Sequence, residues 1–238
     1  MTTKINLGDI ELDVVQKDIQ NIHLSVHPPT GRVTVSAPLH LKPDTIRVFA
    51  ISKLGWIKKQ QKKFQEQERE TQREMVDRES HFVWGKRYLL KVIEEHGPPG
   101  ITIGPSWLQL NAKPGTEPER RRKILEDWYR ERIKERVQEI VELWEPKIGV
   151  KVERIYVQRM KTKWGSCNAA ARSIRINLEL AKKPPECLEY IVVHEMVHIL
   201  EPTHNKRFIA LMDDLMPNWK DYREQLNQLP VAHEDWNH

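Results

Sequence analysis

Hydrophobic and polar residues alternate along the first forty positions of the chain. Alternation with a period of two places every second side chain on the same face of a β-strand. The apolar positions that follow this rule are Ile10, Leu12 and Val14, then Ile22, Leu24 and Val26, then Val33 and Val35 after a Pro-Pro-Thr-Gly turn. This pattern predicts a β-meander.

From Pro43 the apolar residues recur every three or four positions, which is typical of one buried helix face. Ile46, Phe49, Ala50, Leu54 and Ile57 form this series, and Pro43-Asp44 is a typical helix start. Beyond it, up to residue 80, paired lysines are followed closely by acidic residues. We therefore expect a charged, solvated helix or linker around 43–80 rather than a nucleic-acid-binding arm.

The remaining patterns divide the chain into two parts. Short strands are expected around 81–88 and 89–93 and near Ile101 and Leu108, which makes residues 1–115 a β-rich N-terminal module. Thr116 and Glu119 stand in the order of a capping box and predict a long helix to about Trp144. Strands at 152–158 and 173–177, a helix over 186–200 and two more helices complete a predicted C-terminal catalytic domain, 116–238. The fold class is α+β.

Composition narrows the classes of protein that the chain can represent. It has 238 residues, 39 Lys and Arg against 34 Asp and Glu, and a formal charge of +5. This excess permits weak nucleic-acid contact but is less than a dedicated nucleic-acid binder carries. The basic quartet at 120–123 is flanked by acidic residues, so we expect it to be solvated. Cys167 and Cys187 lack the spacing of a zinc knuckle or a disulfide framework.

The chain shows neither a signal peptide nor a membrane anchor. Its first residues lack the apolar segment of a secretory signal, and no apolar run approaches the roughly 20 residues that span a bilayer. We therefore predict a cytoplasmic protein without a membrane partner.

The segment His194-Glu195-Met196-Val197-His198 carries the clearest chemical signal. Residues four apart on a helix project from the same face about 6 Å from each other, so both imidazoles can reach one metal ion. Glu195 points one step round the helix, where it can take a proton from a water on the metal. Burying these polar side chains among Val, Ile and Met is unfavourable unless they are satisfied, and a zinc ion would satisfy them.

His204 is the expected third ligand. It follows His194 by ten residues and lies beyond a helix break at Pro202. Three protein ligands and one open position describe a catalytic zinc rather than a structural one. Carboxylates from the following helices are the alternatives: Asp213, Asp214 and Glu224. The ligand spacing equals that of the metzincins, but Glu201 stands where their pattern has Gly and no Met-turn follows, so that class is disfavoured.

Gly165 interrupts a strand pattern, which marks the close approach of another backbone. One interpretation is a sheet edge to which a peptide substrate adds as an extra strand, with Trp164, Gly165 and Ser166 as substrate-binding residues. The other is a bulge packed on the zinc helix, and both stay open. Cys167 is expected to be a small buried hydrophobe rather than a zinc ligand that keeps the enzyme latent.

These residues together resemble the YgjP-like metallopeptidases, which are related more distantly to the SprT-like zinc proteases. The resemblance is carried by residues 159–167, 174–177, 190–198 and 204–208, and upstream by Gly31 to Val35 and the helix that contains Trp56. It implies a zincin core similar to that of the minigluzincins, with one zinc ion on His194, His198 and His204 and with Glu195 as general base and acid. Typical gluzincins have Glu as the third ligand, whereas this chain has His204.

We therefore predict a zinc metalloendopeptidase that hydrolyses polypeptides through a zinc-bound water activated by Glu195. Two alternatives remain: a zinc-containing binding module, and a nucleic-acid-dependent protease of genome maintenance like the SprT-like relatives. Intact Glu195 argues against the binding module, because a structural zinc site needs no general base.

Overall fold

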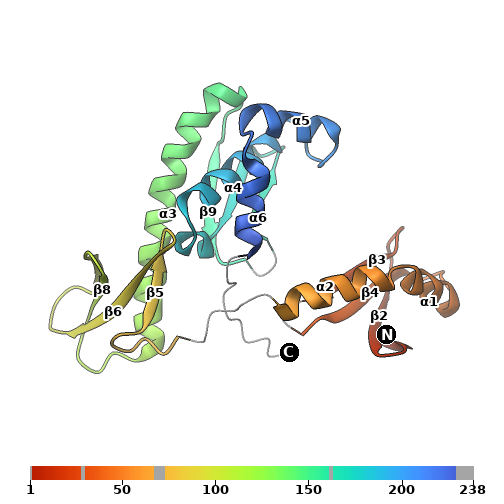
Figure 1. Ribbon diagram of the computed structural model, residues 1–238, viewed down its shortest axis with the longest axis horizontal. Coiled ribbons are helices and arrows are strands. Elements are labelled where there is room, and N and C mark those ends of the chain that lie inside the picture. Colours follow the sequence, from red (N-terminus) through yellow and green to blue (C-terminus); the bar gives the residue numbers. More distant parts are fainter. Residues whose placement is uncertain (1, 28–29, 67–72, 161–162, 229–238) are drawn as a thin grey trace. The chain divides into compact units, whose positions relative to one another are not determined.

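The structure is a computed structural model that describes residues 2–27, 30–66, 73–160 and 163–228 (Figure 1). It has a mixed α+β architecture with three small sheets, each of which contains parallel and antiparallel strand pairs. The chain forms two compact units, Met1–Glu70 and Thr71–His238.

The first unit contains a four-stranded sheet. Its strands are β1 (Thr2–Leu7), β2 (Ile10–Lys17), β3 (His23–His27) and β4 (Arg32–Pro38), in the order β1-β2-β4-β3. The predicted β-meander is wrong, because β2 pairs with β4 in parallel and β3 lies at the edge. Val33, Val35 and Ala37 of β4 are fully buried, whereas β3 is partly exposed. The more apolar strand therefore takes the interior position.

Two helices rather than one follow this sheet. They are α1 (Pro43–Ser52) and α2 (Leu54–Glu66), with the break at Lys53. Ile46 packs in one cluster with residues of β2 and β4, and Ala50 and Ile57 pack in another. The apolar spacing thus indicates the buried face correctly, while the break between the helices lies within it.

The second unit begins with another four-stranded sheet. Its strands are β5 (Ser80–Val83), β6 (Lys86–Glu94), β7 (Gly100–Ile103) and β8 (Trp107–Ala112), in the order β5-β6-β8-β7. The long helix α3 (Pro118–Ile148) follows. The predicted capping box is wrong, because Glu117 is the N-cap and the Thr116 hydroxyl donates to Lys113 O at 2.6 Å. Pro118, which lacks an N–H, occupies the first helical position instead.

A three-stranded sheet and three helices complete the second unit. The strands β9 (Arg154–Gln158), β10 (Gly165–Asn168) and β11 (Ser173–Asn177) are ordered β10-β11-β9, followed by the 3-10 helix η1 (Leu178–Lys182). The helices are α4 (Pro185–Val197), α5 (Lys206–Leu215) and α6 (Trp219–Gln228). One hydrophobic core joins α3, β11, α4, α5 and α6. Helix α4 lies within this core and carries the HExxH segment.

Along the chain, the boundary between the two compact units falls between residues 70 and 71. The boundary predicted from the sequence falls between residues 115 and 116. The difference arises because β5–β8 share the core of α3. Tyr129 Oη of α3 donates to Phe82 O at 2.7 Å, and Trp84 N donates to Ala181 O of η1 at 2.8 Å. The assignment of residues 116–238 as the catalytic domain stays a prediction.

Within the described ranges, none of the helices has both the length and the apolar character needed to cross a bilayer. Cys167 and Cys187 are both free thiols.

Candidate metal centre

Three histidines from the end of α4 and the start of α5 converge on one point. His194 lies in the last turn of α4, His198 is the residue that ends this helix, and His204 immediately precedes the N-cap of α5. The Nε2 atom of His204 lies 3.0 Å from that of His194 and 3.1 Å from that of His198. The structure thus brings together the three histidines that the sequence analysis selected as ligands.

The tautomer of His198 follows from its surroundings. Its Nδ1 atom lies 2.9 Å from the backbone oxygen of Glu201, which can only accept a hydrogen bond. Nδ1 therefore carries a proton and donates, and Nε2 is the ring nitrogen that faces the other two histidines. Such a bond to the far nitrogen is how metal-binding histidines are usually oriented.

The surroundings of His194 and His204 favour the neutral form of both rings. Burial, and then the neighbouring His198 and His204, lower the pKa of His194 to about 3. Burial, and then His198, also lower the pKa of His204. Neutral imidazoles are the forms that bind metals.

The donor set fits a tetrahedral cation. Zinc–nitrogen bonds of 2.0–2.1 Å in tetrahedral geometry place two ligand nitrogens about 3.3 Å apart. The Nε2 separations of 3.0 and 3.1 Å are close to that spacing. An ion at the point where the three nitrogens converge would accept a lone pair from each of them.

The turn between the second and third histidines is held by its own side chains. The Glu201 carboxylate accepts hydrogen bonds from Thr203 N at 3.3 Å and from Thr203 Oγ1 at 3.0 Å. The Asn205 side chain caps α5 by accepting from Phe208 N at 3.0 Å. Because Glu201 also orients His198, this single turn positions both His198 and His204.

The alternative third ligands do not join the cluster. Asp213 accepts hydrogen bonds from Trp219 Nε1 at 2.8 Å and from Lys220 Nζ at 2.9 Å, and is therefore engaged on the opposite end of α5. Asp214 and Glu224 are not part of the group of three histidines that the described residues bring together.

Glu195 is buried beside this cluster, with 5% of its surface exposed. Burial raises its pKa to about 8, although the positive charge of Lys163 acts in the opposite direction. The backbone of β10 passes directly over it. A Cβ atom added to Gly165 would lie 2.6 Å from Glu195 Oε1, 2.8 Å from Glu195 Cγ and 2.9 Å from Ile191 Cγ2. The glycine therefore permits a close approach that no other residue allows.

The strand over Glu195 lies at the edge of its sheet. β10 pairs with β11 in antiparallel register, with Gly165 opposite Ile176. Trp164 and Cys167 are partly buried against the main core, and Ser166 is partly exposed. Burial, and secondarily Glu195, raise the pKa of the Cys167 thiol to about 11, so it stays protonated at neutral pH and is a poor metal ligand.

The sequence analysis missed the residue that holds the segment before β10. The Asn177 side chain donates to Met160 O and to Lys163 O, each at 2.8 Å, and accepts from Met160 N at 3.3 Å. It also accepts from Glu179 N at 3.2 Å and is 4% exposed. An Asn at the end of a strand, in the N-cap position of the helical turn that follows, was the available signal.

A second group of missed residues surrounds the buried Glu179. Arg159 forms ion pairs with Glu179 at 3.3 Å and with Glu126 of α3 at 2.9 Å, and Lys182 approaches Glu179 at 2.7 Å. Burial alone would raise the pKa of Glu179, but Lys182 and Arg159 hold it below its usual value. This network ties the start of the segment before β10 to α3 and η1.

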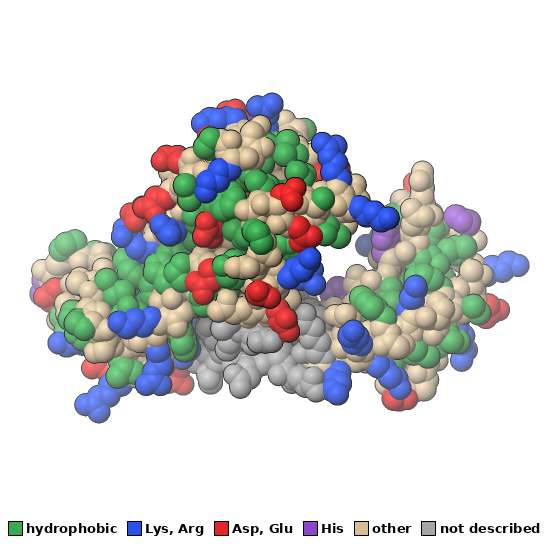
Figure 2. Space-filling model, turned by 45° about the horizontal axis from the view of Figure 1, so that its top comes forward, with side chains coloured by type: hydrophobic (Ala, Val, Ile, Leu, Met, Phe, Trp, Pro, Cys, Tyr) green, Lys and Arg blue, Asp and Glu red, His purple; other side chains and the backbone are tan. Residues whose placement is uncertain are grey.

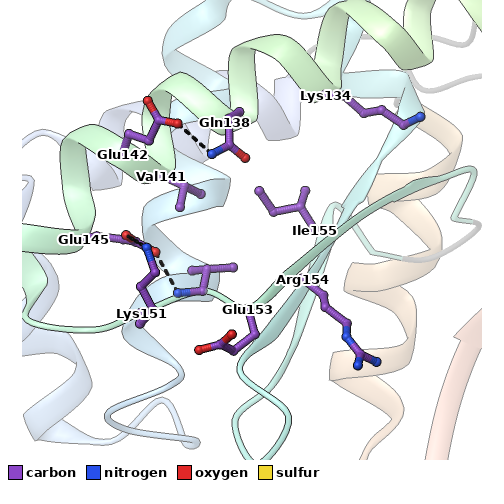
Figure 3. A pocket seen from close by; sticks show the side chains of 10 residues that line it. Lys134, Gln138, Val141, Glu142, Glu145, Lys151, Glu153, Arg154 and Ile155 are labelled. Atoms are coloured by element: carbon purple, nitrogen blue, oxygen red, sulfur yellow. Dashed lines mark hydrogen bonds and ion pairs between the residues drawn. The ribbon is translucent and has the colours of Figure 1, made fainter.

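A pocket of about 470 Å³ lies away from the histidines, between the C-terminal half of α3 and β9 (Figure 3). Its polar side chains largely satisfy one another. Glu145 accepts from Lys151 at 2.9 Å and from Val152 N at 2.8 Å, and Gln138 donates to Glu142 at 2.7 Å. No residue of the histidine cluster lines it.

Most of the basic quartet on α3 is engaged within the fold. Arg121 pairs with Glu94 at 2.6 Å, Arg122 with Glu119 at 3.8 Å and Lys123 with Asp127 at 3.6 Å. On the face drawn in Figure 2, Lys and Arg side chains are interspersed with Asp and Glu. Arg120 and Lys123 are exposed, as expected for a solvated quartet, whereas Arg121 and Arg122 are partly buried.

The fold and the histidine cluster have the character of a metal-dependent peptidase, and the comparison with protein families agrees. The model of the YgjP-like metallopeptidase domain matches residues 20–229, so the chain belongs to the YgjP-like family. This confirms the resemblance seen in the sequence. Membership implies a metal cofactor and a polypeptide substrate.

Two solved structures are similar to part of the chain. One is the metallopeptidase zymogen of Pyrococcus abyssi abylysin, with 16% identity and a TM-score of 0.36, over 40% of this chain and 99% of that one. The other is the metallopeptidase zymogen of Methanocaldococcus jannaschii jannalysin, with 20% identity and a TM-score of 0.35, over 39% of this chain and 88% of that one. No curated protein matches the chain.

Proposed function

We propose that the chain is a zinc-dependent metalloendopeptidase. His194, His198 and His204 hold one zinc ion, and Glu195 is the general base and acid. The observation that carries this proposal is the convergence of the three Nε2 atoms at 3.0 and 3.1 Å, adjacent along α4 to a buried carboxylate. Zinc bound there supplies a Lewis acid that acidifies water and polarises the scissile carbonyl.

Glu195 carries the proton through the reaction. Its carboxylate accepts a proton from the attacking water while the water oxygen bonds to the carbonyl carbon, and it then delivers that proton to the leaving amine as the C–N bond breaks. A general base works best with a pKa near the working pH, and burial raises the pKa of Glu195 to about 8. A divalent cation nearby favours the charged carboxylate and brings this pKa down.

The substrate binds along β10 as an additional strand. Support for this comes from the position of β10 at the end of the β10-β11-β9 sheet and from the contact of Gly165 with Glu195. An extended peptide that pairs with Trp164, Gly165 and Ser166 has its backbone held beside the general base. Backbone pairing of this kind suits an internal peptide bond in an unfolded polypeptide.

Neither alternative function gains support from a specific contact. A binding module would have no use for a carboxylate buried beside three metal-binding histidines, since burial of an unpaired acid is costly. For a nucleic-acid-dependent protease, the ion pairs of Arg121, Arg122 and Lys123 leave less of the basic quartet free for phosphates.

The test compares the zinc-loaded wild type with Glu195→Gln in the cleavage of an unfolded model protein, with new N-termini identified by mass spectrometry. We expect cleavage by the wild type, a loss of 10²-fold or more in the variant, and equal zinc content in both. Equal cleavage rates would refute the proposed role of Glu195. A parallel reaction with single-stranded DNA tests the alternative, which requires stimulation that disappears with salt.

A further inference from the structure

The ring of Phe208 contacts all three histidine rings of the candidate metal centre. Its centroid lies 4.9 Å from that of His194, 4.6 Å from His198 and 4.8 Å from His204. The histidine centroids are themselves 4.8, 5.0 and 4.6 Å apart. The four rings therefore form a closed cluster in which each ring contacts the other three.

The contacts restrict how the imidazoles can turn. Phe208 meets His194 at an interplanar angle of 68° and His204 at 87°, and it stacks on His198 at 29°. Edge-to-face and offset-stacked rings at these separations are favourable arrangements. Phe208 is itself 1% exposed, so it is held in the core and limits the room in which each imidazole can turn.

The position of Phe208 is linked to that of His204 through the start of α5. Asn205 caps the helix by accepting from Phe208 N at 3.0 Å, and His204 immediately precedes Asn205. One turn further on, Met212 is fully buried and anchors the same helix face in the core. The capping turn therefore positions a metal-facing histidine and the ring that packs against all three.

We propose that Phe208 is a positioning residue that holds the three imidazoles in their converging arrangement before the metal binds. This inference rests on the proposed function, because it concerns the zinc ion that these histidines hold. A site that is already arranged loses less conformational freedom on binding, so the ring contributes to metal affinity without contacting the metal. Partners of metal ligands typically change metal affinity 10- to 100-fold when they are replaced.

The experiment measures the zinc dissociation constant of the full chain by competition with a chromogenic chelator, together with the melting temperature of the metal-free protein. Phe208→Leu removes the ring, and Phe208→Met keeps a similar volume without the ring. Ile133→Val and Ile133→Ala are controls, because Ile133 is fully buried in the same core but lies on α3. They show how metal affinity responds to a loss of core packing alone.

We expect the two Phe208 variants to bind zinc about 10- to 100-fold more weakly than wild type, while both Ile133 variants stay within about twofold. The cobalt-substituted Phe208 variants should also show altered d–d absorption bands, which report ligand geometry independently of activity. If the Phe208 variants melt at lower temperature like the Ile133 variants but retain wild-type affinity, Phe208 is only a core residue and the inference is wrong.

A His194→Ala variant separates this inference from the proposed function. Zinc binding by wild type and its loss in His194→Ala establish the metal centre, whatever the Phe208 variants do. If the wild type does not bind zinc, or if His194→Ala binds it equally well, the metal centre is refuted and the role of Phe208 is refuted with it. Should Phe208→Leu fail to fold, Phe208→Met decides the outcome.

Discussion

The candidate site has two sides that differ in how the chain builds them. The histidine side comes from residues 194–208, one continuous segment in which a helix end, a turn and a helix start bring three rings together. The strand side comes from β10 lying over Glu195, and it depends on Asn177, Arg159 and Glu179, which lie outside that strand. The histidine side is thus formed by residues close together in the sequence, whereas the strand side requires the tertiary structure.

We therefore expect the histidine side to govern metal binding and the strand side to govern turnover and stability. Changes on the histidine side should remove the metal, because the donor atoms belong to that segment. Changes on the strand side should leave the metal bound and alter turnover or stability. The following predictions test this separation, beginning with the largest expected effect.

The substitution His198→Ala should abolish zinc binding and reduce cleavage of an unfolded protein by about 10³-fold or more, because one of three donor atoms and its bond to Glu201 are lost. Zinc content by elemental analysis and the rate of cleavage are the measurements. The control is His96→Ala, which replaces an exposed histidine outside the cluster. Retention of stoichiometric zinc by His198→Ala would show that this histidine is not a ligand.

The substitution Gly165→Ala should lower kcat by about 10²-fold with zinc still bound, since a displacement of a catalytic group by about 1 Å has effects of that size. The added Cβ would displace the Glu195 carboxylate. In a Glu195→Asp background, whose shorter side chain removes the contacts with Glu195 but not the one with Ile191 Cγ2, the same substitution should have a smaller effect.

Gly97→Ala is the matched control for this prediction, because a Cβ at Gly97 meets nothing within 4 Å. Unchanged turnover in Gly165→Ala, or a simultaneous loss of zinc, would contradict the assignment of Gly165 to the strand side.

The substitution Asn177→Ala should destabilise the protein by about 1–3 kcal/mol, because the buried Asn177 side chain no longer bonds Met160 O and Lys163 O. Zinc affinity should change little, while the KM for polypeptide should rise as the segment before β10 loosens. Thermal unfolding, zinc competition and steady-state kinetics measure these three effects. The control is Asn168→Ala, which removes one exposed bond to Ala171 N. A loss of zinc affinity in Asn177→Ala would show that the histidine side depends on the strand side, and would contradict the prediction.

The contribution of Glu179 to the stability of the fold should decline at acidic pH. The pKa of Glu179 in the folded protein lies below its usual value, because Lys182 and Arg159 outweigh the effect of burial. A carboxylate of lowered pKa stabilises the fold above its unfolded pKa, and this contribution disappears as the pH falls through the lower folded value.

Glu179→Gln should therefore be less stable than wild type at pH 7, by about 1.5–3 kcal/mol, and the difference should shrink below pH 4. Urea unfolding at several pH values measures it. A difference between the two proteins that is independent of pH would show that the ion pairs of Glu179 do not stabilise the fold.

Several elements of the fold could be predicted because their signals are short in range. The apolar spacing of Ile46, Ala50 and Ile57 indicates a buried helix face, and the structure buries these residues. The sheet order could not be predicted in the same way. The parallel pairing of β2 with β4 depends on which strand is most apolar and on how the helices cover the sheet.

The boundary between the two compact units could not be predicted from local patterns either. β5–β8 have the alternating pattern of an independent β-rich module, yet they share the core of α3 through residues such as Tyr129. A hydrophobic pattern shows that a face is buried but does not identify the surface that buries it.

The sequence by itself determined that three histidines and one glutamate lie within eleven residues, on a helix end and the turn that follows it. Helix periodicity and a proline break are local properties, and they suffice to bring these side chains together. Only the tertiary structure decided that Gly165 passes over Glu195 and that Asn177 bonds to Met160 O and Lys163 O. These contacts join segments through close packing, and packing depends on the shapes of surfaces that meet only when the chain has folded.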